Sequence, residues 1–232
     1  MSEPEAFGSF IDKWRARWPE WAVAEVFVPR EHRESTLAWM ALLQELTDAA
    51  WGGTDPRPGE AKLGWWAEEL QGWSRGVRRH PLGQALQKLP VAWLQLAASL
   101  PSLRGSRERP VDADDACAQV RGFAEVVAGI EQGLFGGQTQ DAIGVITWGL
   151  LLQRLAHHPG DAAPLQVLAR SGEAGAAAEW TRQLAARSST RGATKPRRLL
   201  TALSQARARR GEAVQPVPAM QALWTCWRAA RG

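Results

Sequence analysis

The sequence predicts an all-α protein, and three observations lead to this prediction. Between its proline and glycine breaks, nearly every segment repeats apolar residues at helical spacing. No segment alternates apolar and polar residues for long enough to indicate a strand. Apolar residues make up 45% of the 232 residues, enough for a sizeable core. No linker is long enough to separate two units, so we expect a single domain over residues 1–232.

The expected helices begin and end at these breaks. Prolines that a first helical turn tolerates stand at Pro29, Pro81, Pro164, Pro196 and Pro218. Glycine pairs at 52–53 and 136–137 suit chain reversals. In chain order the expected helices are Glu3–Arg17, Trp21–Val28, Arg30–Trp51, Glu60–Val77, Pro81–Leu100, Asp112–Leu134, Thr139–His157, Ala163–Arg170, Ala174–Ser188, Pro196–Arg210 and Pro218–Ala230.

Tryptophan is unusually abundant, with thirteen residues against no tyrosine. Trp14, Trp18 and Trp21 are four and three residues apart, and Trp66 and Trp73 are seven apart, which places each set on one helix face. Most of these rings are expected in the core. The alternative is a tryptophan-lined cavity for an apolar ligand, because aromatic side chains also dominate ligand pockets.

Two polar clusters have a structural and a metal-binding interpretation. Asp112, Asp114 and Asp115 precede an apolar periodic segment, where acids cap a helix. His157 and His158 precede Pro-Gly and are expected to end a helix, whereas with an aspartate at position 161 they would form a metal site. The structural interpretation is favoured for both.

The cysteines and the N-terminus restrict the protein class further. Cys117 and Cys226 belong to no CxxC pair, so two reduced thiols packed in helices are expected instead of a disulfide or a zinc site. The first ten residues carry acids and lack a signal-type apolar run, which favours a cytoplasmic protein. The longest apolar stretch, Ala142–Leu152, is shorter than the roughly 20 residues of a membrane span.

The formal net charge of +4 favours an anionic partner. The segment 187–210 predicts a basic amphipathic helix. It is either a solvated face or a peripheral membrane contact through Arg197, Arg198 and Arg207. Aromatic residues do not interleave with these bases, so no nucleic-acid partner is expected. Phosphate-binding-loop and Gly-x-Ser-x-Gly motifs do not occur, which gives no support to nucleotide or serine hydrolysis.

Several motifs follow one another in a specific order. A Lys-Leu-x-Trp-Trp-x-x-Glu-Leu run spans 62–70, and His-Pro-x-x-x-Ala-Leu spans 80–86. FAEVVAG follows at 123–129, Ile-Gly at 143–144, Pro-Leu at 164–165 and Ala-Arg-Ser-Gly at 169–172. From about Trp18 to Gly172 the chain therefore resembles the squalene/phytoene synthase family.

This resemblance implies a helical bundle of the isoprenoid synthase type with a central cavity. In that family two facing helices present aspartate-rich motifs whose carboxylates gather Mg²⁺. The metal ions neutralise the diphosphate of a prenyl substrate and help it leave.

The chain departs from both motifs. The first resembles Asp-Asp-x-x-Asp/Glu, and the matching stretch, 47–51, holds only Asp48, with Glu45 three residues before it. The second resembles Asn-Ile-x-Arg-Asp-x-x-x-Asp, and in 151–159 only Arg154 matches. The residual candidates are thus Glu45, Asp48 and Arg154. A Glu45–Asp48 pair could hold one ion weakly, but exposed helix acids are the favoured interpretation. No metal or cofactor is expected.

The N-terminal part differs as well. Where the family carries a run with a phosphate-contacting Ser or Arg, this chain has Arg17-Trp18-Pro19-Glu20-Trp21. Glu25 replaces a small or hydroxyl residue and would repel a diphosphate.

The sequence-based hypothesis is a non-catalytic relative that binds an isoprenoid, another lipid or a partner protein such as an active synthase paralogue. The alternative is an active head-to-head prenyltransferase with an eroded Mg²⁺ site.

Overall fold

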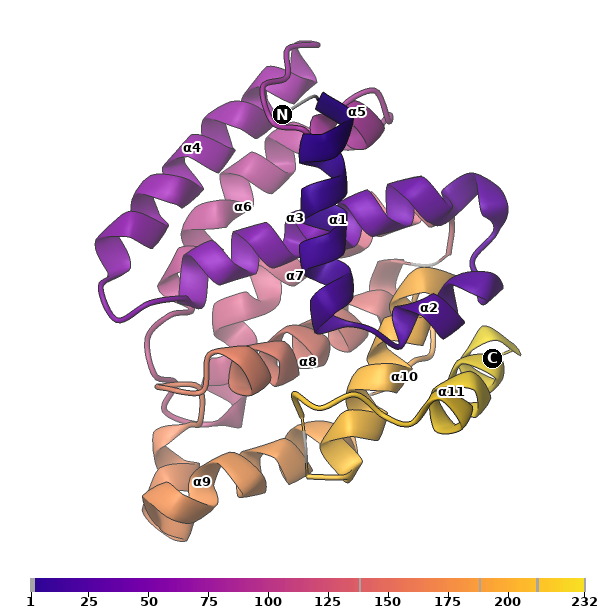
Figure 1. Cartoon of the computed structure of the whole chain (residues 1–232). Helices are drawn as coiled ribbons and strands as arrows, with labels where there is room; N and C mark the ends of the chain where they lie inside the picture. The colour runs from indigo at the N-terminus through magenta and orange to yellow at the C-terminus, as the bar shows by residue number, and fades with distance from the viewer. Residues whose placement is uncertain (1–2, 138, 188, 212, 232) are drawn as a thin grey trace.

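The computed structural model describes residues 3–137, 139–187, 189–211 and 213–231, and these residues form helices and loops without a strand (Figure 1). The prediction of an all-α fold is confirmed. The helices are α1 Glu3–Arg17, α2 Trp21–Ala24, α3 Arg33–Trp51, α4 Pro56–Ser74, α5 Gly83–Leu86, α6 Trp93–Gly105, α7 Ala113–Phe135, α8 Thr139–His157, α9 Leu165–Arg187, α10 Lys195–Arg209 and α11 Ala219–Arg231, with 3₁₀ turns η1 Glu25–Phe27 and η2 Arg30–His32.

Helix α3 lies in the middle of the molecule and contacts α1, α4, α5 and α6 (Figure 1). Helix α7 packs against α6 on one side and α8 on the other. Helix α10 contacts α8, α9 and α11, and α11 in turn packs on α2. Almost all of α3 from Thr36 to Trp51 is buried, so this helix is covered on every side.

Several helix boundaries differ from the expected ones. Helix α4 begins at Pro56 instead of Glu60, because the Asp55 side chain accepts a hydrogen bond from the Arg57 amide (3.0 Å) and caps it. It ends at Ser74 instead of Val77, because Gly76 turns the chain at a φ of 81°.

The prediction of one helix over Pro81–Leu100 is wrong. The structure has α5 and α6, separated by residues 87–92, which include Pro90, and α6 continues through Pro101 to Gly105 instead of ending at Leu100. The expected helices Trp21–Val28 and Arg30–Trp51 each include a 3₁₀ turn, η1 after α2 and η2 before α3. The expected break before Ala174 is present, since α9 is interrupted at Gly172 (φ 65°, ψ 171°), while Ser188 lies outside the described residues.

Local signals read from the sequence are confirmed elsewhere. The Asp112 carboxylate caps α7 by accepting hydrogen bonds from the amides of Asp114 and Asp115. Cys117 and Cys226 form no disulfide. Gly53, with a φ of 70°, makes the reversal after α3. Within the described residues no helix is both long and apolar enough to cross a lipid bilayer.

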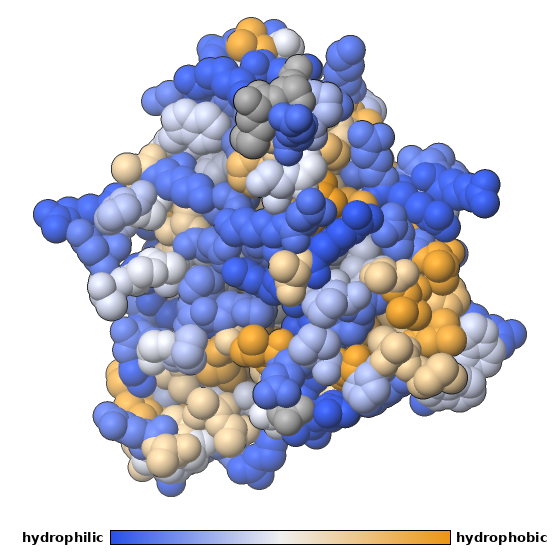
Figure 2. All heavy atoms as spheres, viewed as in Figure 1, coloured by the Kyte–Doolittle hydropathy of each residue, from blue (hydrophilic) through white to orange (hydrophobic). Residues whose placement is uncertain are grey.

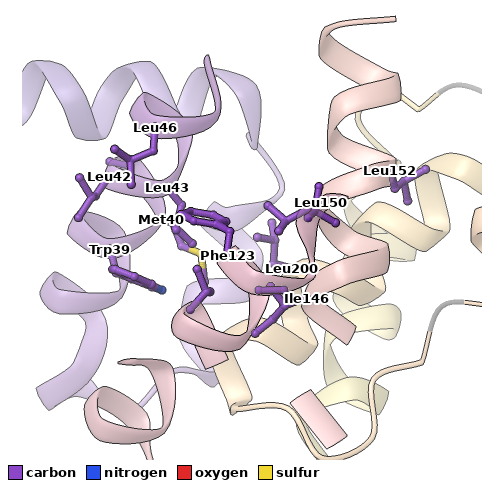
Figure 3. Close-up of a cluster of buried hydrophobic side chains, with 14 of the residues drawn as sticks. Trp39, Met40, Leu42, Leu43, Leu46, Phe123, Ile146, Leu150, Leu152 and Leu200 are labelled. Carbon is purple, nitrogen blue, oxygen red and sulfur yellow. The ribbon is translucent and has the colours of Figure 1, made fainter. Parts of the chain in front are cut away.

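Tryptophan fills much of the core, as expected from its spacing. Nine of the thirteen tryptophans are buried, and the ring of Trp73 makes edge contacts with Trp66 and Trp93. Figure 3 shows the apolar cluster between α3 and α8, where Met40 and Phe123 face Ile146 and Leu150. At the level of this cluster, side chains of the protein itself fill the space between α3 and α8.

The conspicuous Lys-Leu-x-Trp-Trp-x-x-Glu-Leu run has a structural role at its acidic position. Glu69 on α4 is buried and accepts hydrogen bonds from the amides of Arg79 and His80, both at 2.7 Å, and from the indole of Trp73 at 2.8 Å. The His80 ring then packs on Trp66, with centroids 4.4 Å apart. Glu69 therefore holds the His-Pro turn onto α4.

Two buried ion pairs tie α10 to the bundle. Arg207 is fully buried, donates to Glu20 (Nε to Oε1, 2.9 Å) and lies 4.2 Å from the Trp18 ring. Arg197 is also buried and pairs with Glu131 on α7. The sequence predicts a possible membrane contact through Arg197, Arg198 and Arg207. This prediction is wrong for Arg197 and Arg207, because both are buried beside a carboxylate partner. Arg198 is half-buried.

Removal of the Arg207 guanidinium by Arg207→Met is expected to lower the free energy of unfolding by about 3–5 kcal/mol, because Glu20 is left charged and buried without a cation. Urea unfolding followed by circular dichroism measures the change. Arg121→Met is the control, since its pair with Glu125 is exposed and is expected to contribute at most about 1 kcal/mol. An equal decrease in the free energy of unfolding for the two variants would contradict the conclusion that Arg207 compensates a buried charge on Glu20.

Candidate functional site

The candidate site begins with two acids on one face of α3. Glu45 and Asp48 are three residues apart, which places their side chains one above the other. Glu45 is only 4% exposed, and the Asp48 side chain is 17% exposed. The expectation of exposed helix acids is therefore wrong. Both carboxylates lie inside the bundle and need compensating charge.

Two lysines from different helices neutralise Glu45. The Lys13 ammonium on α1 lies 2.6 Å from Oε1, and the Lys62 ammonium on α4 lies 2.7 Å from Oε2. Burial alone raises the pKa of Glu45, but the hydrogen bonds from the two lysines outweigh it and the pKa is lowered. Glu45 is thus ionised at neutral pH, with a cation on each oxygen.

Asp48 is paired on both sides as well. The Arg17 guanidinium makes a two-pronged contact, with Nη1 2.8 Å from Oδ1 and Nη2 3.2 Å from Oδ2. His158, just past the end of α8, places Nε2 3.2 Å from Oδ1. Burial raises the pKa of Asp48, but the hydrogen bonds from His158 and Arg17 outweigh it and lower the pKa to about 2. Asp48 therefore links α1, α3 and α8.

Arg154 does not join this cluster. It is 3% exposed, and its Nη2 donates to three backbone carbonyls. Two belong to the loop before α7, Arg107 (2.7 Å) and Glu108 (3.2 Å), and the third belongs to the loop after α8, Asp161 (3.2 Å). Burial lowers the pKa of Arg154 to about 10, so the guanidinium stays charged at neutral pH. Of the three sequence candidates, Glu45 and Asp48 lie together on one face of α3. Arg154 lies apart from them and stabilises two loops through hydrogen bonds to their carbonyls.

The sequence pattern does not identify as site residues the four nitrogen-bearing side chains of the cluster, Lys13, Arg17, Lys62 and His158. Lys13 and Arg17 are four residues apart on α1, and this spacing places them on one helix face. Lys62 lies in the tryptophan-rich run. The sequence predicts that His157 and His158 end a helix, and α8 does end at His157. Sequence spacing could show that Lys13 and Arg17 act together. It could not show that they meet α3.

The donor set does not fit Mg²⁺. A magnesium ion needs several oxygen ligands in near-octahedral arrangement. All four carboxylate oxygens of Glu45 and Asp48 accept hydrogen bonds from nitrogen donors of the protein, and the facing end of α8 presents Arg154, His157 and His158. Among the described residues there is no group of three or more histidines, cysteines and acids that could hold a metal ion.

Glu25 also has a basic partner, in a more exposed position than the two acids on α3. Its carboxylate lies 3.0 Å from the Arg15 guanidinium on α1. The expected repulsion of a diphosphate by Glu25 is therefore offset by a neighbouring cation.

A pocket of about 390 Å³ opens beside His158, where the C-terminal ends of α3 and α8 meet. Arg107 crosses its wall and donates to the carbonyls of Gly52 (2.9 Å) and Ala50 (3.3 Å). The lining residues are Trp51, Gly53, Thr54, Arg107, Arg154, His158, Pro159, Gly160 and Asp161. Asp161, the acid of this set, pairs with Arg109.

The pocket keeps a positive charge. Two helix C-termini contribute roughly half a negative charge each, whereas Arg107 and Arg154 contribute one positive charge each. Asp161 is balanced by Arg109, and Asp48 behind His158 is balanced by Arg17. An anion rather than a cation therefore suits this pocket, which will be called the α3–α8 pocket.

Comparisons with known proteins identify the fold. No family model and no curated protein matches the sequence. Among solved structures, the crystal structure of squalene synthase HpnC from Alicyclobacillus acidocaldarius aligns with a TM-score of 0.57 over 99% of this chain and 92% of that chain, at 16% identity. The chain therefore has the fold of this squalene synthase, and the expected isoprenoid synthase type of bundle is confirmed.

Asp48 is expected to stabilise the protein in a pH-dependent manner. Its pKa is lowered from 3.8 to about 2 on folding, so its contribution is complete above pH ~4 and is lost as the pH falls toward 2. The difference in unfolding free energy between the wild type and Asp48→Asn should shrink by about 2 kcal/mol over this range.

Urea unfolding at a series of pH values measures this difference. The matched control is Asp12→Asn, the same substitution at an exposed position of α1. A difference that stays constant from pH 6 to pH 2 would show that Asp48 is not held by Arg17 and His158.

Proposed function

We propose that this chain is a non-catalytic, squalene synthase-like protein that binds the anionic end of an isoprenoid or another lipid and does not transfer a prenyl group. One observation carries the proposal: lysine, arginine and histidine side chains already compensate the acids at the first motif position. Lys13 and Lys62 hold Glu45, while Arg17 and His158 hold Asp48.

The physical reason lies in charge balance. Departure of diphosphate needs cations that stabilise the negative charge developing on the leaving group. Mg²⁺ supplies this stabilisation when carboxylates hold the ion where the substrate can reach it. Here a metal ion would have to displace four nitrogen donors from two partly buried carboxylates, and each stranded cation would then need another partner. The cluster is better suited to fastening α1, α4 and α8 to α3.

The ligand side of the proposal rests on the α3–α8 pocket. Its two arginines supply fixed positive charge without a metal ion, and Trp51 and Pro159 supply apolar surface at the same wall. Phosphate groups are well matched by guanidinium. A phosphorylated isoprenoid or lipid would place its anionic end in this pocket.

An active head-to-head prenyltransferase with an eroded site is the alternative. The pairing of Glu45 with Asp48 on one face of α3 is the observation in its favour, because two neighbouring acids survive where the resemblance places the first motif. The non-catalytic protein would bind its ligand without Mg²⁺ and form no prenyl product, whereas the prenyltransferase would need Mg²⁺ and form one. Both assays can be carried out on the same purified protein.

Incubation with farnesyl or geranylgeranyl diphosphate and Mg²⁺ is expected to release no diphosphate above the uncatalysed background. Phosphate-coupled detection and extraction of prenyl products measure the reaction. Magnesium-dependent turnover at an ordinary enzymatic rate that Asp48→Ala abolishes would defeat the non-catalytic proposal and establish the alternative.

Binding of farnesyl diphosphate in the presence of EDTA is expected to be measurable by calorimetry. Thr54→Glu, an exposed change at the pocket wall, should weaken it by about tenfold, because a negative charge is added within a few ångströms of the phosphate. Gln71→Glu adds the same charge on exposed α4 and serves as the control. Equal affinity in both variants, or binding that requires Mg²⁺, would contradict the proposal that the anionic end of the ligand binds in the α3–α8 pocket without a metal ion.

A further inference from the structure

Helix α11 carries an apolar stripe on its outer face. Met220, Leu223, Trp224 and Trp227 are 76%, 39%, 59% and 38% exposed. Their spacing of three, four and seven residues places all four on one side of the helix. The opposite side, with the buried residues Ala222 and Cys226, packs toward α2 and α10. Helix α11 is thus apolar on both faces, and only the inner face is covered within the described residues.

The exposed stripe forms a continuous patch. The rings of Trp224 and Trp227 stack with centroids 4.9 Å apart, and the Arg231 guanidinium lies 4.6 Å from the Trp227 ring. Val26, 60% exposed, lies on η1, which contacts α11. Figure 2 shows hydrophobic residues gathered on the side of the molecule where Figure 1 places α2 and α11.

A basic groove of about 600 Å³ runs beside the stripe, between α10 and α11. Arg209, Arg210 and Arg228 line it together with Trp224 and Gln221, and none of the described lining residues is acidic. Arg209, Arg228 and Arg231 are all exposed. The stripe and the groove together are called the α11 surface.

We infer that the α11 surface docks onto the surface of an anionic phospholipid bilayer. Tryptophan rings favour the membrane–water interface, and arginines beside them meet lipid phosphates. The groove accepts the phosphate of a headgroup, while Met220, Leu223 and the two tryptophans enter the headgroup–acyl boundary. The helix lies in the plane of the interface and does not span the bilayer.

Charge decides between a bilayer and a second copy of the chain. A symmetric dimer through this surface would bring the patch against itself, so Arg209, Arg228 and Arg231 would lie against a surface with the same excess of positive charge. A bilayer with anionic lipids presents the complementary sign over the whole surface. This inference does not rest on the α3–α8 pocket, so each proposal can fail alone.

Vesicle flotation tests the inference on the full chain. The protein is expected to float with phosphatidylcholine vesicles that contain phosphatidylglycerol and to float much less with phosphatidylcholine alone. The double variant Trp224→Ser, Trp227→Ser should reduce partitioning into the vesicles more than about tenfold. Each ring buries more apolar surface in the membrane than two methylene groups would, and each buried methylene group contributes about 0.8 kcal/mol. Arg209→Gln with Arg228→Gln should reduce it about fivefold per arginine, and added salt should act in the same direction.

Two matched variants serve as controls. Trp65→Ser removes a 37% exposed tryptophan on α4, and Arg121→Gln removes an exposed arginine on α7, so neither should change flotation. Circular dichroism checks that each variant is folded, and the arginine variants provide an independent test because their side chains are exposed.

Three results would overturn the inference. The first is no flotation with anionic vesicles, and the second is flotation that the tryptophan and arginine variants leave unchanged. The third is a concentration-dependent dimer in light scattering that disappears in the tryptophan variant, which would assign the α11 surface to a second copy.

Discussion

The structure depends on buried carboxylates that are compensated by cations from distant parts of the chain. Asp48 and Glu45 on the central helix are held from α1, α4 and the end of α8. Glu20 and Glu131 likewise receive Arg207 and Arg197 from α10. Each such pair is a weak source of net stability, yet removing one partner leaves a charge that the interior does not tolerate. The pairs therefore connect helices that are far apart in the sequence.

The same constraint applies to the acids at the centre of the bundle. Buried acids in a helical bundle can be compensated either by metal ions or by cationic side chains of the protein. Here the second arrangement is present at Glu45 and Asp48, and the apolar cluster of Figure 3 fills the space between α3 and α8. A shared fold at 16% identity shows the architecture of the protein and not the chemistry of its site.

Two surfaces of the protein carry positive charge that carboxylates do not fully compensate. The α3–α8 pocket keeps an excess of guanidinium, and the groove along α10 and α11 is lined by arginines without an acid among its described residues. Both places suit anions, but their apolar surroundings differ. A single tryptophan and a proline flank the pocket, whereas an exposed stripe of two tryptophans, a leucine and a methionine flanks the groove.

The amino-acid sequence by itself determined the features that depend on neighbours in the chain. Helical spacing identified the all-α class and the buried tryptophans, and Asp112 identified a helix cap. Only the tertiary structure decided how the helices cross. It buried Arg197 and Arg207, which the basic pattern had placed outside, and it brought Lys13 and Lys62 to Glu45. Periodicity records which face of a helix is apolar, but the partner of a buried charge is set by packing between elements far apart in sequence.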